Sequence, residues 1–307
     1  MTVVPFRVET PQAALDDLAR RLHATRWPEP STVDGWAQGV PLEYLRDLVR
    51  YWADGYDWRA TEARLNRIPQ FAAAADGLDI HFLHVRSPRP DAVPVILTHG
   101  WPGSFLEYEA VLAPSRLLGV HLVPPLVAPI LEDLTPAESA ALADQAARDR
   151  DGSAYSAMHG TRPQTIGYAL LDSPVALCAW IVEKLWTWTD HAGDLSTVLT
   201  RDQVLDTITL YWLTGTGASS ARLYRESIAE VSRWFTSATD DEIAVPMGAT
   251  VFPREVPRPS RRWASERFTD IVHWGEPTCG GHFGAWEQPD IFVAELTTFA
   301  RTLAARS

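Results

Sequence analysis

Apolar residues recur every three or four positions through much of the first 75 residues, which is the spacing of a helix with one buried face. Thr10 and Pro11 open the first such segment, and these residue types favour the N-cap and the first helical position. The helical segments expected here run over about 11–22, 41–53 and 58–66. The pattern therefore predicts a helical N-terminal region over residues 1–75.

After Ala75 the pattern changes to alternating and to short, wholly apolar runs, which are typical of strands. The apolar run 94–98 is of the kind buried on both faces of a parallel sheet. Strands are expected at 78–85, 94–98, 117–123, 243–251 and 270–274, and helices at 135–150, 174–188, 201–212 and 290–304. This order predicts an α/β fold with a mostly parallel sheet.

The long helical stretch between the strands predicts an inserted lid. The expected division is an N-terminal helical region over 1–75, the first part of the α/β core over 76–129, the lid over 130–240 and the rest of the core over 241–307.

The composition of the chain excludes some classes of binding partner. A formal net charge of -12 makes nucleic acid and anionic membranes unfavourable partners. No apolar run reaches the length of about 18 residues that spans a bilayer, and no signal peptide opens the chain. Cys178 and Cys279 match no metal-ligand spacing, and Cys178 fits a buried apolar helix. We expect a soluble, cytoplasmic protein without metal or cofactor.

Several short phrases, in a fixed order along the chain, resemble the microsomal-type epoxide hydrolases of the α/β-hydrolase superfamily, including soluble actinobacterial members. They are Gly35-Trp36, Tyr56-Asp57-Trp58-Arg59, His99-Gly100-Trp101-Pro102-Gly103-Ser104, Thr161-Arg162-Pro163-Gln164-Thr165, Asp172-Ser173-Pro174-Val175, Tyr211-Trp212-Leu213-Thr214-Gly215-Thr216, Phe252-Pro253-Arg254-Glu255 and Gly280-Gly281-His282-Phe283. Each phrase alone is a weak signal, and the ordered set is a strong one.

The resemblance implies a site that opens an epoxide to a vicinal diol. His282 would be the base that activates water, and Glu255, 27 positions earlier, its orienting carboxylate. Tyr155 and Tyr224 would donate hydrogen bonds to the epoxide oxygen, and the backbone N–H of Trp101 would belong to an oxyanion hole.

Each of these residues also has a structural interpretation. His282 would then cap a strand, Glu255 would be a solvated loop residue, and the two tyrosines would fill the core of the lid. His121 and His159 are interpreted as structural, since neither has a partner at metal-ligand spacing, and Asp172 is expected to cap the helix that follows it.

The family's nucleophile, an aspartate on a Gly-Gly-Asp-Trp-Gly type of elbow, is absent from this sequence. Only 12 residues, 105–116, join the turn at 99–104 to the next expected strand, with room for one short helix over 105–112. The resemblance implies two strand-and-helix units at this place, on the order of 70 residues. Activity and stability are therefore expected to be impaired, and exposed sheet edges would favour a homo-oligomer.

Three functional interpretations remain open at this stage. The chain is an epoxide hydrolase by descent with impaired or lost activity, a non-catalytic binding protein for apolar epoxide-like or diol-like ligands, or a deletion product. The substrate class expected from the many tryptophans, 13 in all, is an apolar or aryl epoxide. Without the aspartate, His282 and Glu255 would have to drive direct attack by water.

Overall fold

The computed structural model describes residues 2–86, 95–111, 120–236, 242–255 and 257–306 of the chain. Its N-terminal part holds the three expected helices, α1 (Gln12–His23), α2 (Leu42–Asp54) and α3 (Trp58–Leu65). Thr10 does not cap α1, because Pro11 occupies the N-cap position. The Thr10 hydroxyl instead accepts a hydrogen bond of 2.8 Å from the indole N–H of Trp58.

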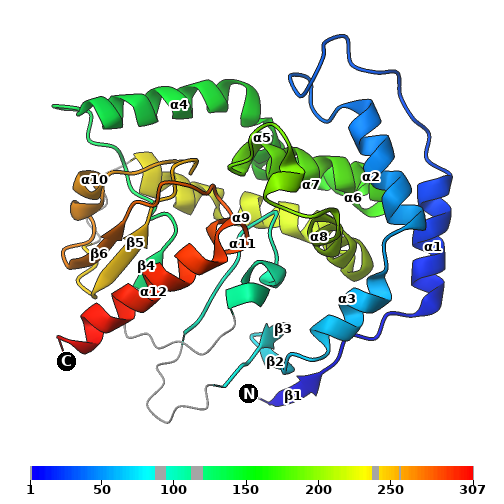
Figure 1. The fold of residues 1–307 in the computed structure, drawn as a ribbon, viewed down its shortest axis with the longest axis horizontal. Helices are drawn as coiled ribbons and strands as arrows, with labels where there is room; N and C mark the ends of the chain where they lie inside the picture. The colour runs from blue at the N-terminus through cyan, green and yellow to red at the C-terminus, as the bar shows by residue number, and fades with distance from the viewer. Residues whose placement is uncertain (1, 87–94, 112–119, 237–241, 256, 307) are drawn as a thin grey trace.

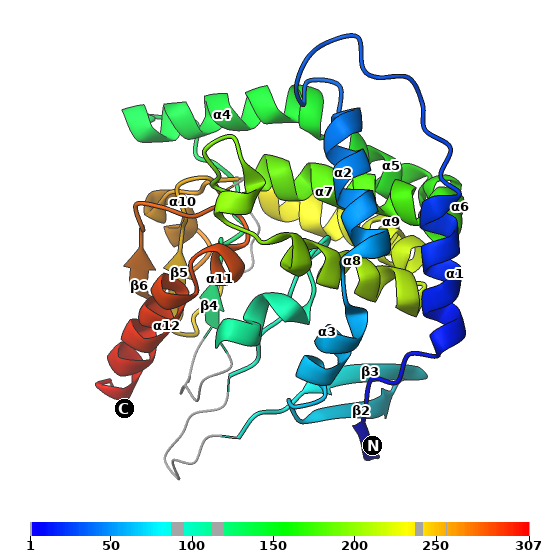
Figure 2. The same ribbon diagram turned by 45° about the vertical axis from the view of Figure 1, so that its right-hand side comes forward.

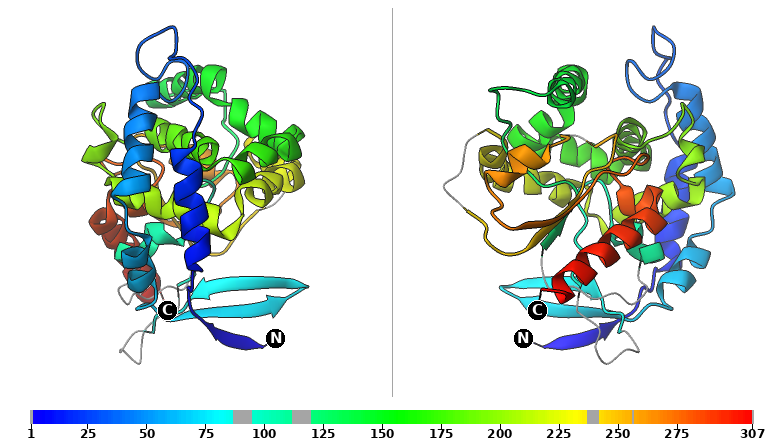
Figure 3. Two further views of the ribbon diagram at one scale, coloured as in Figure 1. Left: turned by 90° about the vertical axis from the view of Figure 1, so that its right-hand side faces the viewer. Right: turned by 60° about the vertical axis from the view of Figure 1, so that its left-hand side comes forward.

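The strand expected at 78–85 is present as β3 (Leu78–Leu83), and the N-terminal part also contains two strands, β1 (Val3–Phe6) and β2 (Gln70–Ala75), that the sequence pattern did not predict. The strands β1, β2 and β3 form an antiparallel sheet in that order. Asp76 and Gly77, both with positive φ, make the two-residue turn between β2 and β3. This hairpin lies across the boundary expected at residue 75, and Figure 3 shows it projecting beside β1.

A second, parallel sheet contains β4 (Val120–Leu122), β5 (Met247–Thr250) and β6 (Ile271–Gly275), with β5 in the centre. All four residues of β5 are buried. The C-terminal helix α12 (Pro289–Ala304) packs on this sheet, and its Phe299 ring approaches Gly248 so closely that a Cβ there would lie 2.6 Å from it. The small helices α10 (Arg261–Ser265) and α11 (Gly284–Glu287) complete this part.

The strand expected at 94–98 is absent: the described residues Val95–Thr98 have irregular backbone, and the Ile96 side chain is 91% exposed. Pro94 lies outside the described residues. An apolar run becomes a strand only when neighbouring strands supply its hydrogen bonds. In the described part of the chain β4, β5 and β6 pair only with one another, so this run has no ladder to join.

The largest hydrophobic core lies among helices. The helical stretch contains α4 (Pro136–Gly152), α5 (Ala154–Thr161), α6 (Pro163–Asp172), α7 (Pro174–Trp188), the 3-10 turn η2 (Leu195–Thr197), α8 (Arg201–Thr214) and α9 (Gly217–Thr236). A second 3-10 turn, η1 (Phe105–Val111), precedes β4. Ile181 and Leu185 of α7 and Leu205 and Ile208 of α8 are fully buried there. Figures 1 and 2 show α5–α9 between the N-terminal helices and the parallel sheet.

Within the described residues, no single helix has the length and apolar composition needed to cross a membrane. The pair α6 and α7 passes that test only when the two are joined, and the chain bends by 116° between them.

Candidate active site

His282 and Glu255 come from the two loops that follow β6 and β5, and the fold brings them into direct contact. The Nδ1 atom of His282 lies 2.6 Å from Oε1 of Glu255. The Glu255 side chain is fully buried, whereas 30% of the His282 side chain is exposed. Burial, the largest single cause, lowers the pKa of His282, but Glu255, with smaller contributions from Glu107 and Glu287, outweighs it, and the net pKa is raised. With Nδ1 engaged, Nε2 is the ring atom left to accept a proton.

A second buried carboxylate fixes the loop that carries His282. Glu287 accepts hydrogen bonds from the backbone N–H groups of Asp190 at 2.7 Å and of Gly281 and Phe283 at 3.1 Å each. Burial is the main cause that raises the pKa of Glu287 to about 7, and these N–H groups act against it. The side chain of Glu287 therefore holds the backbone on both sides of His282.

Trp101, Tyr155 and Tyr224 meet one another in an aromatic cluster. The rings of Trp101 and Tyr155 are stacked, with centroids 5.2 Å apart. Tyr224 packs edge-on against both, at 5.9 Å from Trp101 and 5.8 Å from Tyr155. Tyr155 comes from α5, Tyr224 from α9 and Trp101 from the turn before η1. Three separate segments thus contribute to one cluster.

Trp188, the last residue of α7, joins this cluster to the histidine. Its ring lies 5.3 Å from the ring of Tyr155 and 5.2 Å from that of His282. Its carbonyl also accepts the backbone N–H of His282 at 2.9 Å. All five residues expected from the sequence are therefore in one neighbourhood, and Trp188 is a central member that the sequence pattern did not single out.

Burial keeps both tyrosines in the phenol form that can donate a hydrogen bond. It raises the pKa of Tyr155 and, more strongly, that of Tyr224. The Tyr224 hydroxyl partly lowers the pKa of Tyr155, while Tyr155 raises that of Tyr224. A phenol with a raised pKa remains a proton donor throughout the neutral range.

Glu107 is a further site residue that the sequence analysis missed. It lies in η1, directly after the turn at 99–104, and its buried Oε1 accepts the Ser104 N–H at 3.1 Å. Burial raises its pKa to about 8, and His282 partly counteracts this. The pattern Ser104-Phe105-Leu106-Glu107 has the spacing of a capping box and was the available signal.

His159 contributes packing to the cluster. It is fully buried, its ring lies 4.7 Å from that of Trp101, and its Nε2 accepts the indole N–H of Trp180 at 2.9 Å. Burial, together with Lys184, lowers its pKa to about 4, so the ring is neutral. Within the described residues, no group of three or more His, Cys, Asp or Glu side chains is arranged to hold a metal ion.

The remaining sequence predictions concern residues outside the cluster. Asp172 does not cap α7: Ser173 does, because its hydroxyl accepts the Ala176 N–H at 3.1 Å, while exposed Asp172 approaches Arg21. The Nε2 atom of His121 lies 3.1 Å from the Thr250 hydroxyl, beside the parallel sheet. Cys178 is fully buried in α7, as expected.

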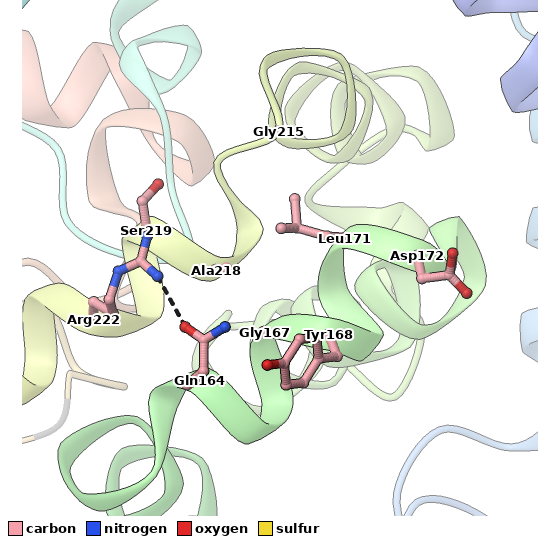
Figure 4. Close-up of a pocket in the computed structure, with 9 residues that line it drawn as sticks. All are labelled: Gln164, Gly167, Tyr168, Leu171, Asp172, Gly215, Ala218, Ser219 and Arg222. Atoms are coloured by element: carbon pink, nitrogen blue, oxygen red, sulfur yellow. Dashed lines mark hydrogen bonds between the residues drawn. The ribbon is translucent and has the colours of Figure 1, made fainter.

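A hollow of about 310 Å³ lies away from this cluster, between α6 and the start of α9. Figure 4 shows Gln164 and Arg222 joined by a hydrogen bond of 3.1 Å at one end and Leu171 and Asp172 toward the other. None of the five expected site residues lines it. The hollow and the candidate active site are thus separate features.

Comparison with known proteins places these features in a family. Residues 3–108 match the sequence family described as "Epoxide hydrolase N terminus". A protein of Stigmatella aurantiaca described as "Putative epoxide hydrolase" is 39% identical, over 99% of this chain and 86% of its own length. Epoxide hydrolase 1 of Sus scrofa is 26% identical, over 97% of this chain and 88% of its own.

Solved structures with a similar fold are also epoxide hydrolases. An enantioselective mutant of the Aspergillus niger epoxide hydrolase aligns with a TM-score of 0.87 and 28% identity, covering 98% of this chain and 96% of that one. The juvenile hormone epoxide hydrolase of Bombyx mori, at 21% identity, shares the fold with a TM-score of 0.85.

The sequence alignments are longer than the chain itself. The alignment with the Stigmatella protein spans 384 residues and that with the porcine protein 402, whereas the chain has 307. The relatives therefore hold many residues for which this chain has no counterpart. The agreement in sequence along nearly the whole chain, and in fold, shows that this chain belongs to the microsomal-type epoxide hydrolase family of the α/β-hydrolase superfamily.

Proposed function

We propose that this protein acts on epoxides, which it opens to vicinal diols. His282 and Glu255 activate water, Tyr155 and Tyr224 donate hydrogen bonds to the epoxide oxygen, and the N–H of Trp101 contributes to an oxyanion hole. The observation that carries the proposal is the 2.6 Å contact between His282 and buried Glu255. The His282 ring lies next to the ring of Trp188, which also contacts Tyr155. Epoxide opening requires a base and an acid near each other, and the Trp188 ring contacts both His282 and Tyr155.

We further propose that the lid comprises residues 130–240 and carries both phenols, while the core segments 76–129 and 241–307 carry Trp101, Glu255 and His282. The first segment, 1–75, is the proposed N-terminal region. The rings of Trp101, Tyr155 and Trp188 favour an apolar or aryl epoxide as substrate, because flat apolar groups bury well against aromatic faces.

The family's nucleophile is proposed to be missing from this chain. Three observations support this: no Gly-Gly-Asp-Trp-Gly type of elbow occurs in the sequence, the alignments exceed the length of the chain, and Val95–Thr98 pairs with no strand among the described residues. The family's ester intermediate then has no elbow aspartate to form on. Removal of a nucleophile usually costs most of the rate, so we expect turnover to be slow.

The remaining groups support a direct route in which water itself attacks. His282 takes a proton from water as the water oxygen bonds to an epoxide carbon. The bond between that same carbon and the epoxide oxygen breaks, and the released oxygen takes a proton from Tyr155 or Tyr224. Transfer of the proton from His282 to the phenolate then restores the site, so that one water has been added to the epoxide.

The test is turnover of styrene oxide by the purified chain, with His282→Gln as the control. A single turnover in ¹⁸O-labelled water distinguishes the two routes. Direct attack places the label in the first diol formed, whereas an ester route takes that oxygen from a protein carboxylate. Turnover that is unchanged in His282→Gln would contradict the proposed base.

A non-catalytic binding protein is the second candidate, and the absence of the nucleophile elbow favours it. In that case the folded chain binds styrene oxide or its diol, 1-phenyl-1,2-ethanediol, and forms no product. Quenching of the tryptophan fluorescence measures this binding, because Trp101 and Trp188 belong to the proposed site.

A further inference from the structure

Lys184 is a buried cation that faces the aromatic cluster from α7. Only 3% of its side chain is exposed. Its Nζ atom lies 4.6 Å from the centre of the Tyr155 ring and 5.9 Å from that of Trp188. These are distances at which a cation and an aromatic ring attract each other.

The other contacts of Lys184 are with acceptors next to the cluster. Its Nζ atom forms an ion pair of 2.6 Å with Glu183 and donates a hydrogen bond of 3.4 Å to the carbonyl of Gly152 at the end of α4. Burial of an ammonium group is costly even when it is paired. An apolar side chain of the same length would fill this space without that cost, so the position of the charge calls for an explanation.

Two influences raise the pKa of the Tyr155 phenol. Burial raises the pKa of this phenol, and the carboxylates of Asp149 and Glu183 raise it further. A positive charge against the ring favours negative charge on the phenol oxygen, because opposite charges attract strongly where water is excluded. The effect is largest when Tyr155 has given its proton to the substrate.

We propose that Lys184 is a positioning residue that strengthens Tyr155 as a hydrogen-bond and proton donor to the oxygen of the ligand. Its charge also adds to burial, the larger cause, in lowering the pKa of His159, whose neutral ring packs in the cluster and accepts the hydrogen bond from Trp180. The inference rests on the proposed role of Tyr155. A purely structural alternative would have Lys184 only tie α7 to the end of α4 through Gly152.

The first test is a double-mutant cycle with Lys184→Met and Tyr155→Phe, read out as the dissociation constant of 1-phenyl-1,2-ethanediol. Lys184→Met should weaken binding about tenfold, a size within the range of partly desolvated cation–ring contacts. It should have little further effect in the Tyr155→Phe background, because the phenol through which it acts is gone. Equal weakening in both backgrounds, or none in either, would overturn the proposal. Lys184→Arg, which keeps the charge, is the matched control for folding and packing.

The second measurement does not require binding or turnover. Histidine NMR follows the titration of His159, whose pKa of about 4 should rise measurably in Lys184→Met, while burial still holds it below 6.5, and should stay at about 4 in Lys184→Arg. An unchanged titration in a folded Lys184→Met variant means that the charge does not act on the cluster, and the inference fails. If neither diol nor epoxide binds but His159 titrates as expected, the proposed function fails while the charge of Lys184 still acts on the cluster.

Discussion

The contact between His282 and Glu255 leads to a pH dependence with a definite direction. Only neutral His282 accepts a proton, and the Glu255 carboxylate raises the pKa of the ring against the effect of burial. The rate should therefore rise with pH through a midpoint above 6.5, the ordinary value for histidine. In Glu255→Gln the rate should fall roughly a hundredfold or more, while the midpoint moves to lower pH. The measurement is kcat/KM for styrene oxide against pH; a midpoint that moves upward in the variant would contradict the assigned pair.

Glu107 leads to a prediction on stability. Its folded-state pKa of about 8 lies above the ordinary value of 4.5. The unfolded chain therefore loses this proton first, and the contribution of Glu107 to stability is complete below about pH 4.5 and is lost as the pH rises through about 8. Glu107→Gln still accepts from Ser104 and carries no charge. At pH 8.5 its melting temperature should exceed that of the parent by roughly 2 to 4 °C, the effect of about 1 kcal/mol in a domain of this size. Near pH 5 the two proteins should melt closer together, and a constant difference would count against a buried carboxyl.

Single residues show what the sequence could reveal about the site. The resemblance named His282, Glu255 and the two tyrosines, because each lies in or near a recognisable phrase. Glu287 and Lys184 were missed because a charged residue is expected at the surface, and only tertiary structure shows that it is buried. Trp188 was missed because a tryptophan at the end of an apolar helix is normally a core residue.

Among the elements, helices were predicted better than strands. The limits 174–188 expected for α7 agree with the structure, because Ser173 and Pro174 mark a helix start locally. A strand depends on distant partners. The short edge strand β1 contains Pro5 and was not expected, whereas the apolar run at 94–98 was expected to be a strand and has irregular backbone over the described residues.

The segment Val95–Thr98, which pairs with no described strand, should tolerate substitution unusually well. Because Ile96 is 91% exposed, Ile96→Ser should change the free energy of unfolding by less than about 0.5 kcal/mol. Ile181→Ala, in the fully buried centre of α7, should lower it by roughly 2 to 5 kcal/mol. Urea unfolding of the two variants and the parent gives both values. A cost at residue 96 similar to that at residue 181 would show that the segment is packed in a sheet in solution.

At the scale of the whole molecule, one sheet edge has no strand partner among the described residues, and the chain carries a strong negative charge. In the described structure β4 pairs with β5 on one side only, and its other edge has no strand partner. Two copies could pair there, but the net charge of -12 repels them. Salt screens this repulsion, so the mass measured by light scattering should increase with protein concentration more steeply at ~0.5 M than at ~0.05 M NaCl. A monomer mass under all these conditions would show that the edge is protected.

The position of Trp188 has a consequence for how the molecule tolerates change. One residue carries both the carbonyl that fixes His282 and the ring that adjoins Tyr155. The spacing between His282 and Tyr155 is thus set by Trp188 at the end of α7, and it does not depend on the number of strands in the sheet. A protein built in this way can gain or lose strands elsewhere and still keep His282 and Tyr155 at the same spacing.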